Sequence, residues 1–369
     1  MKIIFVAGAR PNFMKIAPLM WELKRREERG ELNNTQFKLV HTGQHYDIEM
    51  SEVFFKELQI PVPDINLEVG SASHAVQTAK IMIEFEKICL EEMPDLVVVV
   101  GDVNSTIACT LVASKLGIKA AHVEAGLRSF DRTMPEEINR LLTDSLCDYL
   151  FTSCDDANKN LIREGISESK IFLVGNIMID SIMRYKEEAE KRETYKNYGL
   201  NKKNYSLLTL HRPSNVDEEK SLQKMYEIIK KISQYIPVLF PVHPRTRECF
   251  KNFNIEVNTN NSNSIIFEKP LGYIEHLNLI MNAKFVLTDS GGIQEETTVL
   301  KVPCLTLRKN TERPITVTIG TNTLVGNDEK KIMENIWRIL NGTYKNSPER
   351  PLYWDGKTAK RTIDILINT

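Results

Sequence analysis

The sequence contains no apolar run of about 18 or more residues, so no membrane-spanning helix is expected. Its apolar N-terminus, residues 1–9, is too short for the core of a secretory signal. Its six cysteines are scattered and form no C-x-x-C pair, which excludes the common zinc and disulfide-exchange motifs. Such cysteines fit a reducing compartment, and we expect a cytoplasmic protein.

An excess of charge of either sign is also missing. The chain has 48 Lys and Arg residues against 49 Asp and Glu residues, a net charge of -1. This balance provides no general attraction to nucleic acid or to a membrane surface, and neither is expected as a partner. Low-complexity segments and short repeats are absent from the sequence as well. At 369 residues, the chain is long enough that two domains are expected.

Short β-branched runs alternate with longer segments of helical period, the pattern of βαβ units around a parallel sheet. In the first half, strands are predicted at 3–7, 37–41, 96–100, 120–123 and 149–151, with helices at 14–26, 75–92 and 105–116. In the second half, strands are predicted at 205–210, 238–241, 264–267, 285–288 and 303–307, with helices at 218–235, 271–281 and 293–300. The sequence therefore predicts an α/β protein with two Rossmann-like, doubly wound domains, 1–175 and 176–356, and a ligand cleft between them.

The first strand is followed at once by a glycine turn and two cations, Arg10 and Lys15. Ligands of doubly wound sheets bind beyond the carboxyl ends of the strands, where a helix N-terminus and cations can hold phosphate. The run lacks the G-x-G-x-x-G and P-loop spacings, so neither a dinucleotide site nor a P-loop is indicated. An ordinary strand-helix turn with surface cations explains this run equally well.

Carboxylates stand at the ends of two further predicted strands, Asp102 after 96–100 and Glu124 after 120–123. A carboxylate desolvated at a strand end can have a raised pKa, which suits proton transfer. The alternative for the first strand end is that Asp102 or Asn104 caps the next helix.

Pro135 marks a helix start and places Glu136 and Glu137 in the first turn. The spacing of Glu136 and Arg140 puts both on one helix face, so a salt-bridged helix N-terminus could account for them. That explanation leaves out Glu124, which stands at a different strand end. Three acidic groups converging from different elements favour acid/base chemistry.

In the second half, a histidine follows the predicted strand 205–210 and a pair of glycines comes shortly after the predicted strand 285–288. His211 could act as a general acid or a phosphate ligand, although a lone histidine at a strand end is often structural. Ser290-Gly291-Gly292 opens a helix and predicts a nest of N–H groups for a diphosphate rather than a plain helix cap. Glu296 could accept hydrogen bonds from ribose hydroxyls, and Arg313 could supply countercharge.

The sequence shows no metal cluster and no nucleophile elbow. His41 and His45 are four residues apart but straddle a turn, and no third ligand stands nearby. No G-x-S-x-G motif is present. The residues indicate proton transfer together with phosphate binding.

Taken in order, these motifs closely resemble those of the non-hydrolysing UDP-N-acetylglucosamine 2-epimerases, from residue 2 to about residue 340. The motifs that carry the resemblance are Gly8-Ala9-Arg10-Pro11, Thr42-Gly43-Gln44-His45, Gly101-Asp102, His122-Val123-Glu124-Ala125-Gly126-Leu127-Arg128, Pro135-Glu136-Glu137, Ser290-Gly291-Gly292-Ile293-Gln294-Glu295-Glu296 and Thr311-Glu312-Arg313-Pro314.

The resemblance implies a glycosyltransferase-B-like pair of domains, with a C-terminal helix at about 357–369 that returns to the first domain. It implies a homodimer that needs neither a metal nor a redox cofactor. The implied reaction inverts C2 of the sugar by eliminating UDP to give a 2-acetamidoglucal and then adding UDP back. UDP-GlcNAc and UDP-ManNAc would be interconverted in this way for polysaccharide biosynthesis.

The resemblance also assigns roles to individual residues. Asp102, Glu124 and Glu136 form the acid/base set, and His211 assists at the diphosphate, but the sequence does not decide which carboxylate takes the proton. The residues implied to bind UDP or the sugar are Arg10, Lys15, Gln44, His45, Arg140, His243, Ser290, Gly291, Gly292, Glu296 and Arg313.

Some positions depart from the commonest family pattern, and they leave the exact substrate and allosteric activation by a second UDP-GlcNAc open. Ser214 stands where many members have glutamate, and 46–47 and 244–247 also differ. These variants are similar to a branch that includes epimerases of UDP-2,3-diacetamido-2,3-dideoxyglucuronic acid. In that case Arg245 and Arg247 either meet a substrate carboxylate or lie at the surface. Glycosyl transfer on the same fold is a further alternative, which the carboxylate set disfavours.

Overall fold

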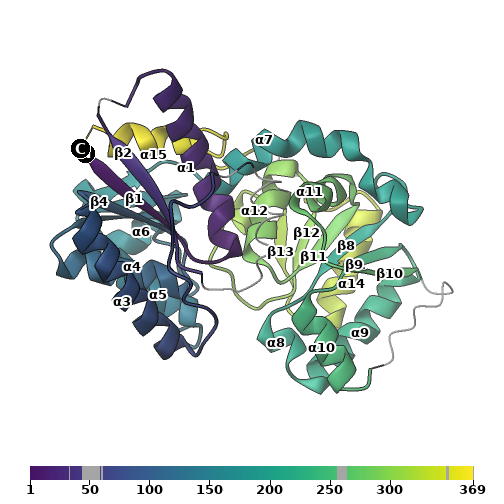
Figure 1. The fold of residues 1–369 in the computed structure, drawn as a ribbon. Helices are drawn as coiled ribbons and strands as arrows, with labels where there is room; N and C mark the ends of the chain where they lie inside the picture. Colours follow the sequence, from purple (N-terminus) through teal and green to yellow (C-terminus); the bar gives the residue numbers. More distant parts are fainter. Residues whose placement is uncertain (33, 44–58, 60, 256–263, 346–348, 369) are drawn as a thin grey trace. The chain divides into compact units, whose positions relative to one another are not determined.

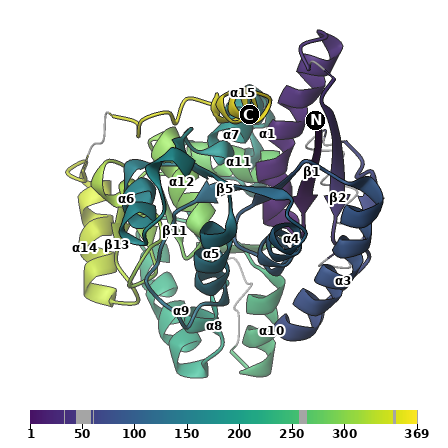
Figure 2. The same ribbon diagram turned by 90° about the vertical axis from the view of Figure 1, so that its left-hand side faces the viewer.

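The computed structural model describes residues 1–32, 34–43, 59, 61–255, 264–345 and 349–368. The chain divides into two compact units, the first made of Met1–Met183 with Leu352–Thr369 and the second of Arg184–Pro351. The division falls inside helix α7 (Ile177–Arg192). Each unit has a parallel sheet with helices on it (Figures 1 and 2).

The first unit contains a parallel sheet in the strand order β3-β2-β1-β4-β5-β6-β7. Its strands are β1 (Lys2–Ala7), β2 (Gln36–His41), β3 (Ile65–Asn66), β4 (Leu96–Val100), β5 (Lys119–Ala125), β6 (Tyr149–Thr152) and β7 (Ile171–Leu173). Its helices besides α7 are α1 (Arg10–Glu28), α3 (His74–Glu92), α4 (Asn104–Lys115), α5 (Pro135–Leu146), α6 (Asp155–Arg163) and α15 (Thr358–Leu366). Every residue of β4 is buried because helices cover both faces of a parallel sheet, which explains its unbroken Leu-Val run.

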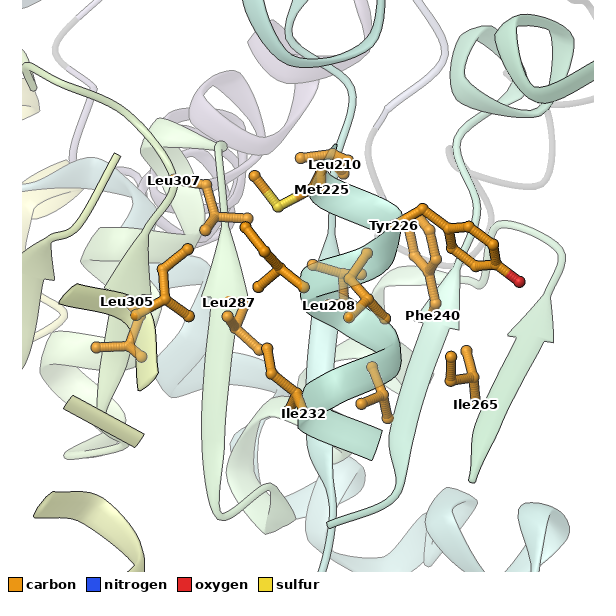
Figure 3. Close-up of a cluster of buried hydrophobic side chains, with 14 of the residues drawn as sticks. Leu208, Leu210, Met225, Tyr226, Ile232, Phe240, Ile265, Leu287, Leu305 and Leu307 are labelled. Carbon is orange, nitrogen blue, oxygen red and sulfur yellow. The ribbon is translucent and has the colours of Figure 1, made fainter. Parts of the chain in front are cut away.

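The second unit repeats this arrangement in the order β10-β9-β8-β11-β12-β13. Its strands are β8 (Ser206–Thr209), β9 (Val238–Pro241), β10 (Ile265–Glu268), β11 (Phe285–Thr288), β12 (Cys304–Thr306) and β13 (Asn322–Leu324). Its helices are α8 (Pro213–Val216), α9 (Glu219–Ser233), α10 (Pro244–Asn252), α11 (Tyr273–Asn282), α12 (Gly291–Leu300), α13 (Ile315–Thr318) and α14 (Glu329–Leu340). Figure 3 shows side chains of α9, among them Met225 and Ile232, packed on Leu208, Phe240 and Leu287 of the sheet.

The predicted fold class is confirmed, since both sheets are parallel and doubly wound. In each sheet the chain first adds strands on one side of a central strand and then crosses to add the remaining strands on its other side. The two adjacent strands at this crossing lead into connections on opposite faces of the sheet. In the first sheet these are β1 and β4, and in the second they are β8 and β11. This is the point at which open α/β sheets bind their ligands.

The last residues of the chain belong to the first unit, where α15 lies beside α1 (Figures 1 and 2). Trp354 is buried and its Nε1 donates a hydrogen bond to the Ser153 carbonyl at 2.9 Å. Asp180 of α7 accepts from the backbone N–H of Ala359 at 2.8 Å and so caps α15. A Cβ added to Gly175 would lie 2.1 Å from the Tyr353 carbonyl oxygen, so only glycine fits there.

Within the part of the chain that the structure describes, none of the helices combines the length and apolarity needed to cross a bilayer.

Candidate active site

Two carboxylates lie at the carboxyl ends of the adjacent strands β4 and β5. Asp102 follows β4 by two residues, and Glu124 is the penultimate residue of β5. Gly101 takes a φ of +67°, and its N–H donates to the Val123 carbonyl at 3.1 Å. This bond joins the two strand ends that the sequence singled out as candidate acid/base positions.

Glu124 is held in an unusual backbone conformation. Its φ is +78°, a left-handed value that costs a residue with a side chain of order 1–3 kcal/mol. The pairing of β5 with β6 shifts register between Val123 and Ala125, so Glu124 is the extra residue of a β-bulge. Bulges of this kind redirect a side chain and are common beside active sites.

The Glu124 carboxylate forms an ion pair with Lys15 of α1, and both side chains are more than nine-tenths buried. A Cβ at Gly101 would lie 2.8 Å from Lys15 Nζ, so the glycine makes room for this pair. The sequence assigned Lys15 to phosphate, and the structure places its charge on a carboxylate. This ion pair holds the Glu124 carboxylate in one orientation at the end of β5.

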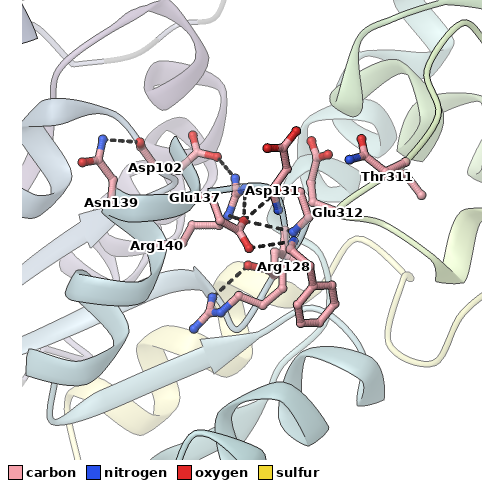
Figure 4. Close-up of polar contacts among 12 residues, drawn as sticks. Asp102, Arg128, Asp131, Glu137, Asn139, Arg140, Thr311 and Glu312 are labelled. Atoms are coloured by element: carbon pink, nitrogen blue, oxygen red, sulfur yellow. Dashed lines mark hydrogen bonds and ion pairs between the residues drawn. The ribbon is translucent and has the colours of Figure 1, made fainter. Parts of the chain in front are cut away.

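Asp102 is held by Arg140 from the first turns of α5, as Figure 4 shows. Arg140 Nη1 lies 2.5 Å from Asp102 Oδ2, and its Nη2 lies 2.5 Å from Glu137 Oε2. The Asp102 side chain keeps about 30% of its surface exposed, whereas Arg140 and Glu137 are buried. Asp102 is therefore the member of this group that solvent or a ligand can reach.

The helix-face pair expected between Glu136 and Arg140 is replaced by the pair between Glu137 and Arg140. Glu137 also accepts from the backbone N–H of Ser129 at 3.0 Å and of Phe130 at 2.8 Å. Burial would raise the pKa of Glu137, but these N–H groups and Arg140 lower it. Glu137 thus anchors the loop before α5, while Glu136 is half-buried and has no hydrogen bond or ion pair with another described residue.

A buried ionic network lies behind both strand ends, and the sequence did not single it out. Asp144 of α5 accepts from His122 Nδ1 at 2.6 Å and from the Gly126 N–H at 3.0 Å, and it pairs with Arg128 at 2.8 Å. His122 Nε2 donates to the Gly101 carbonyl at 2.8 Å. Burial would raise the pKa of Asp144, but His122 and Arg128 lower it. One carboxylate therefore fixes the Glu124–Gly126 turn directly and the Gly101 turn through His122.

Three sequence-predicted residues of the first unit are not described in full. Gln44 and His45 lie outside the described residues. Arg10 is the first residue of α1, and its side chain lies outside the described part of the structure.

In the second unit, His211 and Asp289 follow the adjacent strands β8 and β11. His211 Nδ1 lies 2.9 Å from Asp289 Oδ1, and the imidazole keeps about a third of its surface exposed. The His211 ring also lies 5.3 Å from the ring of His243, which caps α10 by accepting from the Arg245 N–H. Two of the predicted ligand-binding residues are thus neighbours beyond the carboxyl ends of β8 and β9.

Helix α12 opens at the Ser-Gly-Gly run as predicted, ahead of the predicted range 293–300, with Ser290 as N-cap and Gly291 as its first residue. The Ser290 side chain makes no hydrogen bond to the first turn, so it does not compete with a ligand for these N–H groups. A Cβ at Gly291 would lie 2.5 Å from Arg313 Nη1 and 2.6 Å from Glu312 Oε1. Gly291 therefore lets a buried ion cluster pack against the helix start. A Cβ added at Gly292 would meet no atom within 4 Å.

In the ion cluster at this helix start, the guanidinium of Arg313 forms ion pairs with two carboxylates. Its Nε lies 2.7 Å from Glu295 Oε1 and its Nη1 lies 2.6 Å from Glu312 Oε1. Burial would raise the pKa of Glu312, but Arg313 and Arg308 lower it well below its usual range. Arg313 therefore stabilises two carboxylates, a structural task that the sequence did not predict for it.

Glu296 is buried in α12, and its Oε2 has no hydrogen-bond partner among the described residues. Burial and the neighbouring charge of Glu295 raise the pKa of Glu296 to about 8. Near neutral pH this carboxyl is therefore mainly protonated, and its O–H can donate a hydrogen bond. An unsatisfied buried oxygen is what a ligand hydroxyl would complete.

The raised pKa of Glu296 predicts a pH-dependent stability. The folded state holds a proton that the unfolded state loses above about pH 4.5, so this stabilisation falls as pH rises toward about 8. Relative to the Glu296→Gln variant, the wild-type free energy of unfolding should fall by up to about 1.4 kcal/mol per pH unit. Urea unfolding at several pH values measures this slope. Glu334→Gln at the exposed face of α14 should keep the wild-type slope, and an equal slope in Glu296→Gln would contradict the prediction.

Comparison with known proteins identifies the family. The family profile described as UDP-N-acetylglucosamine 2-epimerase matches residues 28–367 of this chain. The UDP-N-acetylglucosamine 2-epimerase of Methanocaldococcus jannaschii is 45% identical over 371 residues, 99% of each chain. The UDP-2,3-diacetamido-2,3-dideoxy-D-glucuronate 2-epimerase of Pseudomonas aeruginosa is 38% identical over 370 residues, again 99% of each chain.

Solved structures agree with this assignment. The crystal structure of Methanocaldococcus jannaschii UDP-GlcNAc 2-epimerase in complex with UDP-GlcNAc and UDP matches with a TM-score of 0.90 at 44% identity, covering 100% of both chains. A lipopolysaccharide outer core galactosyltransferase matches with a TM-score of 0.55 at 13% identity over 99% of this chain and 100% of its own, which is a likeness of fold alone. The chain is therefore a member of the UDP-N-acetylglucosamine 2-epimerase family, built on a glycosyltransferase-B-like fold.

Proposed function

We propose that this chain interconverts UDP-GlcNAc and UDP-ManNAc by eliminating UDP and adding it back. The observation that carries the proposal is the pair of cation-held carboxylates, Glu124 with Lys15 and Asp102 with Arg140, at adjacent strand ends. The relative from Methanocaldococcus jannaschii and its complex with UDP-GlcNAc and UDP support the choice of substrate.

The chemistry needs more than one proton-transfer group. A carboxylate removes the C2 proton, the C–H electron pair forms the C1–C2 double bond, and the C1–O bond breaks as UDP leaves with its pair. In the second half, a carboxylic acid delivers a proton to the opposite face of C2 and a UDP oxygen attacks C1. Asp102, Glu124 and Glu136 form the proposed acid/base set, in which the charges of Lys15 and Arg140 keep two carboxylates oriented.

The second unit is proposed to bind UDP. The first turn of α12 offers N–H groups to the diphosphate, Glu296 meets the ribose hydroxyls, and His211 meets the leaving phosphate. Arg313 contributes mainly by holding Glu295 and Glu312 against the start of α12. Arg10, Gln44, His45 and His243 stay proposed ligand-binding residues on the family resemblance.

Exchange of the C2 hydrogen with solvent tests the proposed reaction. Incubation with UDP-GlcNAc in D2O should give deuterium at C2 of both epimers, with the UDP-sugars intact at equilibrium. Release of UDP and free ManNAc would indicate a hydrolysing epimerase instead. Transfer of the sugar to an acceptor without C2 exchange would indicate a glycosyltransferase, and no exchange with either sugar nucleotide would rule the proposal out.

The alternative substrate is UDP-2,3-diacetamido-2,3-dideoxyglucuronic acid, which the Pseudomonas aeruginosa relative favours. Arg245 is bound on both oxygens of Asp217, at 2.8 and 2.5 Å, and Arg247 donates to the Glu268 carbonyl at 3.2 Å. Both arginines therefore already bind protein groups, which weighs against either of them binding the carboxylate of a uronic acid substrate. Assays with the two UDP-sugars side by side decide between the substrates.

The enzyme is also proposed to work as a homodimer in the cytoplasm. All six cysteines are free thiols, which suits a reducing compartment. Val76, Ile83 and Leu90 are exposed at intervals of seven residues along α3, so they form an apolar stripe on one helix face.

Charged side chains introduced into this stripe are expected to dissociate the dimer into monomers. The variant Ile83→Glu/Leu90→Glu should elute as a monomer with intact secondary structure, because two carboxylates would be desolvated in an apolar interface. Light scattering after size-exclusion chromatography measures the mass. The matched variant Glu334→Gln on the exposed face of α14, away from this stripe, should stay dimeric. An unchanged dimer mass for the double variant would place the interface elsewhere.

A further inference from the structure

Asp289, which follows β11, is fully buried and surrounded by donors. Its Oδ2 accepts from the backbone N–H groups of His211 at 2.9 Å and Arg212 at 2.8 Å, and from Asn215 Nδ2 at 3.1 Å. Its Oδ1 lies 2.9 Å from His211 Nδ1. One carboxylate thus determines both the backbone turn after β8 and the orientation of the imidazole that this turn carries.

The contact at Oδ1 determines which ring nitrogen of His211 carries hydrogen. Burial would raise the pKa of Asp289, but His211 and the backbone N–H groups lower it, so the carboxylate is ionised and can only accept. Nδ1 must then be the donor. In the neutral ring this leaves Nε2 without hydrogen, at the end of the side chain away from Asp289.

We propose that Asp289 is a positioning residue that holds His211 with Nδ1–H toward itself and thereby leaves Nε2 to exchange a proton with the UDP diphosphate. This role rests on the proposed function, because it assumes that His211 acts on the leaving UDP. The tautomer itself follows from the contacts within the second unit alone. A carboxylate that orients a histidine in this way also stabilises the imidazolium that forms when Nε2 takes a proton.

Ring nitrogen NMR tests the tautomer directly. In wild-type protein labelled with ¹⁵N in histidine, at a pH where the ring is neutral, His211 should show hydrogen on Nδ1 and none on Nε2. Loss of one set of signals in His211→Gln assigns the resonances. The opposite tautomer in the wild-type protein would overturn the proposal, and this measurement does not depend on whether any Asp289 variant folds.

The variant Asp289→Asn should reverse the tautomer. Three donors converge at the Oδ2 position, so the asparagine oxygen should stay there and its NH₂ group should face His211 Nδ1. Nδ1 must then accept, which places the hydrogen on Nε2. An Asp289→Asn protein that melts cooperatively but keeps hydrogen on Nδ1 would also overturn the proposal.

Turnover separates positioning from stability. Asp289→Asn should lower the rate of C2 exchange by about a hundredfold, and the same change should cost less than about twofold in a His211→Gln background because the two residues act as one unit. Equal losses in both backgrounds would count against action through His211. Asp328→Asn, an exposed cap of α14, should keep wild-type turnover. Absence of C2 exchange in the wild-type enzyme would reject the proposed function and leave the tautomer result standing.

Discussion

Glu124→Gln and Asp102→Asn should each lower the rate of C2 deuterium exchange by about a hundredfold or more, the usual size for loss of a general acid or base. Each amide keeps the shape of the side chain and cannot take up a proton. UDP affinity should stay near the wild-type value because neither carboxylate is among the proposed UDP contacts. Isotope exchange and UDP titration measure the two quantities, and wild-type exchange in both variants would overturn the assignment.

Stability must be separated from chemistry in this test. Glu124→Gln leaves Lys15 buried beside a neutral amide, and loss of one partner of a buried ion pair costs about 3–5 kcal/mol. The double variant Lys15→Met/Glu124→Gln removes both charges and should recover much of that loss without recovering exchange. Glu86→Gln, exposed on α3, should change neither property. Recovery of exchange in the double variant would show that Glu124 matters only for the fold.

Asp144→Ala should destabilise the first unit by about 3–5 kcal/mol, because it leaves His122, Arg128 and the Gly126 N–H without a buried acceptor. Urea unfolding followed by tryptophan fluorescence in a Trp337→Phe background reports on this unit, because Trp21 and Trp354 both belong to it. The matched variant Asp156→Ala removes a partly exposed carboxylate from α6 and should cost at most about 1 kcal/mol. Equal losses in the two variants would show that the Asp144 network contributes no more than a surface charge.

The sequence predicted most of the buried strands, whereas the amphipathic helices α6 and α14 were not predicted. Strand β4 was predicted at its observed bounds, and α12 was predicted to open at Ser290-Gly291. The short strands β3, β7 and β13 have two or three residues and lie toward the sheet edges, so they leave no periodic signal to find. Hydrophobic pattern therefore suffices for the central strands and for the four-residue edge strand β10, and fails for the shorter strands at the other edges.

The candidate site divides in the same way. Asp102 and Glu124 could be singled out because a carboxylate directly after an apolar run is conspicuous in a sequence. The tasks of Glu137 and Asp144 could not, because a charged residue on a helix is normally solvated and only packing against β5 and the preceding loop buries these two. The spacing of Arg140 and Asp144, four residues on one helix face, was the available signal.

The return of residues 352–369 to the first unit has a consequence for synthesis on the ribosome. The second unit is one continuous stretch, whereas the first lacks Trp354 and α15 until residues after 351 have emerged. Domains usually complete folding in the order of synthesis. Here the order is reversed, so the unit that is begun first is expected to complete its folding after the second unit has been synthesised. The proposed acid/base site of the first unit is therefore expected to form late.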